Sequence, residues 1–123
     1  MTLRPALACI GLALALLWGA FLWADTPRHF RTRASWYGWA EAGKIMANGR
    51  PFDPTKYTCA SPWLPMGVVV RVTNLRNGLS VVVVVTDRGP HKRGRGIDLS
   101  RAAAEKVDMI IEGVVPVEVE VVR

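Results

Sequence analysis

The longest apolar stretch of the chain lies near its N-terminal end. Residues 6–24 contain no charged and no strongly polar side chain, and Trp18 and Trp23 stand in the second half of the stretch. A helix rises about 1.5 Å per residue, so this stretch is long enough to cross the ~30 Å hydrocarbon core of a bilayer with tryptophans at the interface. The pattern predicts an N-terminal hydrophobic helix over residues 1–24, acting as a signal anchor or a signal peptide. The anchor is favoured because no clear small-x-small cleavage site follows.

β-Branched runs dominate the middle of the chain. Residues 68–73 and 80–86 are two such runs, and Asn77-Gly78 between them supplies the positive-φ residues of a tight hairpin. The unbroken valines of the second run predict a central strand that is covered on both faces. A short basic stretch, residues 25–33, follows the apolar segment and is interpreted as a linker.

The remaining pattern predicts a mainly β fold with little helix. Residues 38–65 are rich in glycine, proline, asparagine and aspartate, which is typical of loops. Residues 99–107 have high helix propensity, with Asp98 or Ser100 available as the N-cap. Several strands with one short helix suit a small barrel, and we predict a single domain over residues 34–123. Further short strands are expected at residues 34–37, 57–60 and 114–122.

Charge and cysteine usage narrow the class of partner. The formal net charge is +6, which fits binding to nucleic acid, anionic lipid or an acidic polymer. Export by the N-terminal segment argues against nucleic acid and leaves phospholipid and the anionic polymers of the cell envelope. Cys9 lies within the apolar segment and Cys59 beyond it, so no disulfide, zinc site or lipidation is predicted. Cys59 is interpreted as a small buried hydrophobe.

Carboxylates are the candidates for chemistry, because the chain offers no phosphate loop, metal-ligand cluster or Ser-His-Asp order. Asp87 ends the valine-rich strand and begins a turn, where partial burial would favour the protonated form that a general acid needs. The alternative is a turn aspartate that accepts hydrogen bonds from backbone N–H groups, and the sequence slightly favours this alternative. This structural alternative is stronger for Asp98, as a helix cap, and for Asp53, as a turn initiator. His91 is interpreted as a solvated loop residue.

Short motifs follow one another along most of the chain beyond the apolar segment. They are Ala-Ser-Trp-Tyr-Gly at 34–38, Ala-Asn-Gly at 47–49, Asp-Arg-Gly-Pro at 87–90 and Gly-Ile-Asp-Leu-Ser at 96–100. In this order and spacing the chain resembles the double-psi β-barrel domain of the rare lipoprotein A family of septal-ring lytic transglycosylases, which is related in fold to expansins. The resemblance implies a small six-stranded double-psi β-barrel with one or two short helices.

The resemblance also implies an activity, the cleavage of peptidoglycan glycan strands without water. An acid protonates the glycosidic oxygen, and a base lets the C6 hydroxyl close a 1,6-anhydro ring; one carboxylate can play both parts. The family's catalytic aspartate falls on Asp87, and no cofactor or metal is expected. The residues expected to support Asp87 or to contact substrate are Asp98, Asp53, Arg50, Arg88, Tyr37 and Ser61.

Two substitutions separate this chain from the family's catalytic pattern. Arg50 stands where the family has a glutamate partner of Asp87, and Ser61 stands where it has a histidine. Glu41 in the preceding loop is a candidate replacement. The alternative function is therefore a non-catalytic, expansin-like module that binds peptidoglycan. A third alternative is a membrane-tethered scaffold that makes no contact with glycan.

The expected partners and location follow from these inferences. The partners are peptidoglycan glycan strands, the membrane through residues 1–24, and division or lysis machinery, with no nucleic acid. The predicted location is the cell envelope, with the domain in the periplasm or otherwise outside the cytoplasmic membrane.

Overall fold

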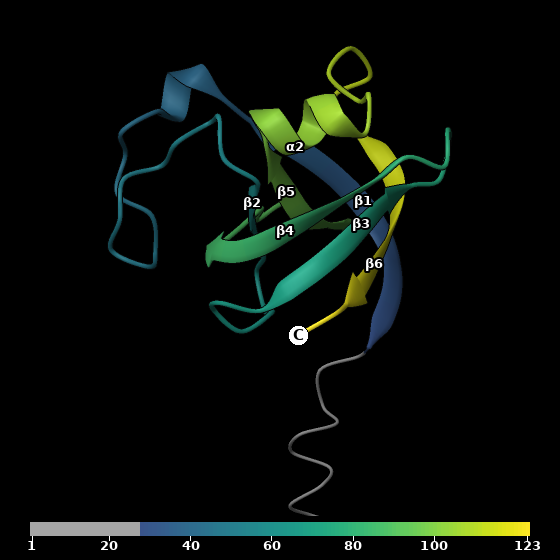
Figure 1. Ribbon diagram of the computed structural model, residues 1–123, viewed down its shortest axis with the longest axis horizontal. Helices are drawn as coiled ribbons and strands as arrows, with labels where there is room; N and C mark the ends of the chain where they lie inside the picture. The colour runs from purple at the N-terminus through teal and green to yellow at the C-terminus, as the bar shows by residue number, and fades with distance from the viewer. Residues whose placement is uncertain (1–27) are drawn as a thin grey trace, which may run out of the picture.

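The computed structural model describes residues 28–123, which form a closed barrel of six strands (Figure 1). Around the barrel the strands follow one another in the order β1-β5-β2-β4-β3-β6. One α-helix, α2 (Arg101–Lys106), and one short 3-10 helix, η1 (Trp39–Glu41), accompany the barrel. The strands are β1 (His29–Tyr37), β2 (Thr58–Ala60), β3 (Val69–Asn74), β4 (Ser80–Asp87), β5 (Arg95–Ser100) and β6 (Val115–Val121).

This architecture confirms the predicted mainly β, six-stranded barrel with short helices. The pairs β1/β5 and β2/β4 are parallel, whereas the other neighbours in the barrel are antiparallel. The predicted N-terminal hydrophobic helix lies outside the described residues. Within residues 28–123, no helix is both long and apolar enough to cross a membrane.

Alternating side chains of the strands fill the barrel. On β4, Val81, Val83 and Val85 are buried, whereas Val82 and Val84 between them are exposed by 45% and 36%. The prediction that both faces of this strand are covered is therefore wrong. A strand in a single-layered barrel has one inner face, and valine is tolerated on the outer face because of its high β propensity. The core also contains Leu64, Ile97, Leu99, Val107, Met109 and the inward residues of β3 and β6.

The β3–β4 hairpin is confirmed, but its turn differs from the predicted one. Thr73 pairs with Ser80, and the connection closes with a hydrogen bond from the Asn74 amide to the Leu79 carbonyl at 2.8 Å. Within this turn only Gly78 has a positive φ, of 77°. Asn77 instead donates from its side-chain amide to the Val107 carbonyl at 3.0 Å.

Two boundaries near the candidate site also differ from the prediction. β1 begins at His29, before the predicted start at Ala34, so residues 29–33 of the predicted linker pair with β6. β5 was not predicted as a strand, and it contains Asp98. The N-cap of α2 is Ser100, whose hydroxyl accepts a hydrogen bond from the Ala103 amide. Asp98 is thus a strand residue and does not cap the helix.

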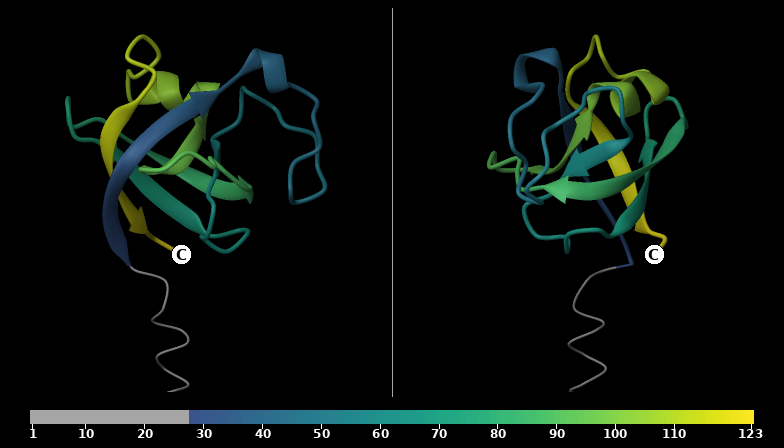
Figure 2. Two further views of the ribbon diagram at one scale, coloured as in Figure 1. Left: turned by 180° about the vertical axis from the view of Figure 1, so that it is seen from behind. Right: turned by 60° about the vertical axis from the view of Figure 1, so that its left-hand side comes forward.

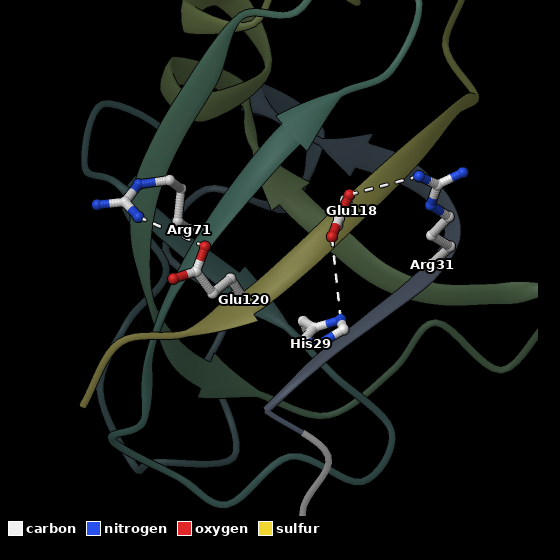
Figure 3. A network of polar contacts seen from close by, with 5 residues as sticks. All are labelled: His29, Arg31, Arg71, Glu118 and Glu120. Carbon is white, nitrogen blue, oxygen red and sulfur yellow. Dashed lines mark ion pairs between the residues drawn. The ribbon is translucent and has the colours of Figure 1, made fainter.

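Charged side chains on the outer face of β6 pair with the strands on either side (Figure 3). Glu118 lies 3.8 Å from Arg31 and 4.0 Å from His29, and Glu120 lies 3.6 Å from Arg71. All five side chains are substantially exposed, and such exposed ion pairs contribute little stability. Both glutamates therefore point to solvent from the last strand of the barrel.

Candidate active site

Residues of four neighbouring strands, three of them polar, lie in one row across the sheet. Ser35 of β1 pairs with Asp98 of β5, Asp98 pairs with Ala60 of β2, and Ala60 pairs with Asp87 of β4. Directly paired residues of a sheet point to the same side. Ile97 and Leu99, the neighbours of Asp98, are fully buried in the core, so Asp98 and its partners Ser35 and Ala60 face outward from the barrel. The register of β2 against β4 shifts between Cys59 and Ala60, which brings Asp87 level with Ala60.

Asp98 is the most perturbed carboxyl group of the described residues. Its Oδ1 is buried and has no hydrogen-bond partner. The pKa of this carboxyl is raised from 3.8 to about 6, chiefly by burial; the hydrogen bond with Ser35 and the charge of Arg95 oppose the rise, and the negative charges of Glu41 and Asp87 add to it. A carboxyl group with a pKa near 6 retains its proton in part near neutral pH, as a general acid requires.

Glu41 reaches this carboxyl from the connection between β1 and β2. That connection leaves the barrel at η1, extends to one side and returns at β2 (Figure 2). Glu41 ends η1, and its Oε2 accepts a hydrogen bond from the Gly38 amide at 3.0 Å. Gly38 follows Tyr37, which pairs with Ser100, two residues beyond Asp98. The hydrogen bond therefore holds the Glu41 carboxylate near Asp98.

Tyr37 adds a second buried polar group without a partner. Its ring stacks on Phe52, with ring centroids 4.2 Å apart and planes inclined by 21°. The phenol oxygen and the Thr58 hydroxyl are both buried and lack a partner in good hydrogen-bond geometry, although Thr58 is close enough to oppose the rise in the Tyr37 pKa. Burial raises the pKa of Tyr37 strongly, and the negative charges of Asp87 and Asp98 raise it further, so this phenol keeps its proton and remains a hydrogen-bond donor.

Asp87 is held by the backbone on both sides. Its Oδ1 accepts hydrogen bonds from the Ala47 amide at 2.9 Å and the Arg88 amide at 2.8 Å. The bond from Arg88 is of the kind expected of a turn aspartate. The bond from Ala47 was not apparent from the sequence, because it joins segments 40 residues apart. One oxygen of Asp87 thus fixes the side chain, and these contacts do not involve Oδ2.

The loop that carries Arg50 is tied to the end of β4. The Asn48 amide donates to the Thr86 carbonyl at 3.2 Å, and the Thr86 hydroxyl lies 3.4 Å from Met46 Sδ. Arg50 follows in the same loop, where its amide donates to Asn48 Oδ1 at 3.0 Å. Its side chain is exposed and forms no ion pair with a carboxylate of residues 28–123.

The other predicted residues make contacts that hold loops. Asp53 accepts from the Thr55 amide and hydroxyl, which lowers its pKa, so it initiates a turn as expected. The Ser61 hydroxyl is buried and accepts from the Leu64 amide at 3.0 Å. Arg88 donates from Nη1 to the carbonyls of Ser61 and Leu64. These bonds fix the 61–64 segment beside Asp87, because the Ser61 amide donates to the Asp87 carbonyl.

The structure therefore brings Asp98, Asp87, Tyr37 and Glu41 together. Cys59 lies beneath them, fully buried, and burial raises the pKa of its thiol, as a structural cysteine requires. Among the described residues, no group of three or more His, Cys, Asp or Glu side chains is placed to hold a metal ion. The arrangement offers a partly protonated carboxyl group, a second carboxylate and a neutral phenol, which together can move protons.

Comparisons with known proteins agree with this fold. Residues 29–119 match the family described as "Lytic transglycolase". The chain is 47% identical over 97 residues to "Probable endolytic peptidoglycan transglycosylase RlpA" of Aquifex aeolicus, covering 79% of this chain and 43% of that protein. It is 46% identical to "Endolytic peptidoglycan transglycosylase RlpA" of Campylobacter jejuni, covering 72% and 32%. The chain thus spans less than half the length of these curated relatives.

Solved structures share the fold. The expansin of Clavibacter michiganensis superposes with a TM-score of 0.61 at 21% identity, over 77% of this chain and 50% of that one. The Streptomyces papain inhibitor superposes with a TM-score of 0.65 at 28% identity, over 79% and 96%. The expansin likeness agrees with the predicted relation in fold. Because the family model covers most of the chain and the curated relatives are well above 30% identical, the chain belongs to the lytic transglycolase family.

Proposed function

We propose that this barrel cleaves the glycan strands of peptidoglycan as a lytic transglycosylase, with Asp98 as the proton donor. The observation that carries the proposal is the half-buried Asp98 carboxyl group, whose Oδ1 is buried without a partner and whose pKa is raised to about 6. Membership of the family and relatives named as peptidoglycan transglycosylases supply the substrate class.

The proposed reaction uses two carboxyl groups and no water. Protonated Asp98 donates its proton to the glycosidic oxygen between N-acetylmuramic acid and N-acetylglucosamine, and the bond from that oxygen to C1 of muramic acid breaks. The C6 hydroxyl of the same muramic acid then bonds to C1, and Asp87 accepts the hydroxyl proton. The products are a 1,6-anhydro end and a free C4 hydroxyl. Transfer of the proton from Asp87 back to Asp98 completes the cycle.

The neighbouring groups suit this division of roles. Two amide hydrogen bonds to Oδ1 orient Asp87, and Oδ2 takes no part in them. The Tyr37 phenol, kept neutral, can donate a hydrogen bond to a sugar oxygen. Glu41 acts through Asp98, because its negative charge disfavours ionisation of the acid. Glu41 thereby replaces the glutamate that the family has at the position occupied by Arg50 in this chain.

The proposal includes a location and partners. The substrate places the barrel in the cell envelope, outside the cytoplasmic membrane. We retain residues 1–24 as the membrane anchor or signal and the residues after them as a short tether, with the barrel starting at β1. Division or lysis machinery is the proposed protein partner.

A second candidate function is a glycan-binding module without catalysis. The observation that favours it is Arg50, which is exposed on the loop tied to Asp87 and replaces the acidic partner expected from the family. A cation there adds affinity for an anionic strand but no proton transfer. Binding without cleavage would then be the whole activity.

Product analysis separates these two functions. The full chain is incubated with glycan strands stripped of stem peptides, and the products are analysed by mass spectrometry. We expect 1,6-anhydro ends with wild type and their loss with Asp98→Asn and with Asp87→Asn, while Glu120→Gln, on the outer face of β6, keeps the wild-type yield. Co-sedimentation with cell wall but no anhydro ends in any of these proteins would establish the binding module.

A further inference from the structure

Cationic side chains gather beside the carboxylates of the site. Arg33 of β1 pairs directly with Arg95 of β5 in the parallel ladder. A tight turn brings Lys92 and Arg93 to the same place, because the Arg95 amide donates to the Lys92 carbonyl at 3.1 Å and Gly94 has a φ of 80°. The four residues Arg33, Lys92, Arg93 and Arg95 are called the cationic patch below.

Arg33 packs directly over this turn. Its amide donates to the Gly94 carbonyl at 3.4 Å, and a Cβ atom built on Gly94 would lie 2.7 Å from Arg33 Nη2. Glycine is favoured at position 94 because of its left-handed φ, whereas the exposed Arg33 side chain could move aside for a Cβ atom. The turn therefore lies directly beside the Arg33 guanidinium.

The patch residues form no close ion pair, although the charge of Arg95 acts on the Asp98 carboxylate and lowers its pKa. Like charges brought together on neighbouring strands are destabilising. Within residues 28–123, the ion pairs within 4.0 Å involve His29, Arg31, Arg71 and Arg101, and none involves the patch. Clustered cations that form no close ion pair create a positive potential that attracts an anionic ligand.

The patch and the site share one face of the barrel. Alternate residues of a strand point to the same side and lie about 7 Å apart, so Arg33 and Ser35 are neighbours on the outer face of β1. Ser35 pairs with Asp98. A polymer bound across Asp98 therefore has its next sugar within reach of the patch.

We propose that the cationic patch binds a carboxylate carried on the lactyl ether of muramic acid, either the free lactyl carboxylate or, where a stem peptide is joined to it by an amide bond, a carboxylate of that peptide. This inference rests on the proposed function. Only every second sugar of the strand carries such a group, whereas the N-acetylglucosamine between them is neutral. Binding of one muramic acid at the patch would set the register of the strand, and so determine which of the two kinds of glycosidic bond lies at Asp98.

Binding assays with charged and neutral strands test the patch. The full chain carrying Asp98→Asn, which leaves strands intact, is titrated with stripped glycan strands, with strands that keep their stem peptides, and with chitin oligosaccharides, which lack the lactyl group. We expect at least one of the two charged strands to bind about five-fold more tightly than chitin at low salt. The tighter of the two identifies which carboxylate is bound.

Two patch variants and one control complete the test. Arg33→Gln/Arg95→Gln should abolish the preference for charged strands, and so should Lys92→Gln/Arg93→Gln, which alters only the exposed turn and leaves the strand pairing intact. Arg71→Gln, on another face of the barrel, should keep the preference. Equal binding of chitin and charged strands, or an unchanged preference in both patch variants, would overturn the inference while leaving the proposed function standing. Failure of all strands to bind would overturn both.

Discussion

Asp87 and Asp98 are two strands apart because each pairs with the same residue of β2. Ala60 pairs with Asp87 in the parallel ladder and with Asp98 in the antiparallel ladder. Neighbouring strands are about 4.8 Å apart, so the backbones of the two aspartates lie roughly 10 Å apart. The small side chain of Ala60 leaves no bulky group between the two carboxyl groups.

The first prediction concerns stability and pH. The pKa of Asp98 is raised from 3.8 to about 6, mainly by burial, so the folded protein binds this proton more tightly than the unfolded chain. The resulting stabilisation is complete below about pH 4 and is lost as pH rises through 6. Asp98→Asn cannot ionise, so from about pH 4 to about pH 8 it should gain up to about 3 kcal/mol in unfolding free energy relative to wild type. Urea unfolding of both proteins at the two pH values measures this gain. An equal difference in unfolding free energy between variant and wild type at both pH values would contradict it.

The second prediction concerns the pH dependence of cleavage. Only protonated Asp98 can donate to the glycosidic oxygen, so the yield of anhydro ends should fall above about pH 6, approaching ten-fold per pH unit. Initial rates between about pH 5 and about pH 8 test this. Glu120→Gln, distant from the site, should show the same profile. A rate that stays constant to about pH 8 would exclude Asp98 as the acid.

The third prediction restores the family's acidic residue at position 50. The Ala47 amide ties this loop to Asp87, so a carboxylate introduced by Arg50→Glu should enter the site. We expect cleavage to rise at least about ten-fold, since a positioned acid or base commonly contributes more than that. Lys44→Glu makes the same change of charge elsewhere in the connection and should have little effect. An equal gain in both variants would point to net charge and not to position.

The fourth prediction separates the chemistry of Tyr37 from its packing. Tyr37→Phe keeps the ring stacked on Phe52 and removes a buried hydroxyl that has no partner. An unpaired buried polar group costs about 1–3 kcal/mol, so the variant should unfold with a free energy about 1 kcal/mol higher than wild type. Its kcat should nevertheless fall about ten-fold if the phenol contacts a sugar oxygen. Tyr57→Phe, at an exposed tyrosine, is the matched control. Reduced stability with an unchanged kcat would contradict both parts of the prediction.

Local patterns predicted those parts of the fold that local forces specify. Two β-branched runs around a glycine-containing turn were enough to place β3 and β4, and alternation after Val117 was enough for β6. β5 was missed because only Ile97 and Leu99 alternate within it and glycines precede them, which falls below the length of an ordinary strand signal. Whether one or both faces of β4 are buried could not be predicted either. A run of consecutive valines occurs both in sheets that are covered on one side and in sheets that are covered on both.

The electrostatics of the site depends on contacts between distant segments. Asp98 was interpreted as a helix cap because a helix follows it, whereas Ser100 takes that position and leaves Asp98 facing outward from β5. The raised pKa of Asp98 depends on burial and on Glu41, which comes from a different strand connection. Nothing local in the sequence around Glu41 indicates this approach. The sequence therefore showed the residues of this row as separate motifs, but it did not show that they lie side by side.

The most direct test of the account is the pKa of Asp98 itself, measured by carboxyl-carbon NMR titration of the full chain, with Asp98→Asn used to assign the signal. The account predicts a midpoint of about 6 for wild type. It also predicts a lower midpoint in Glu41→Gln, because one of the negative charges that oppose ionisation is removed. A wild-type midpoint near the ordinary value for aspartate would contradict the claim that Asp98 is the proton donor.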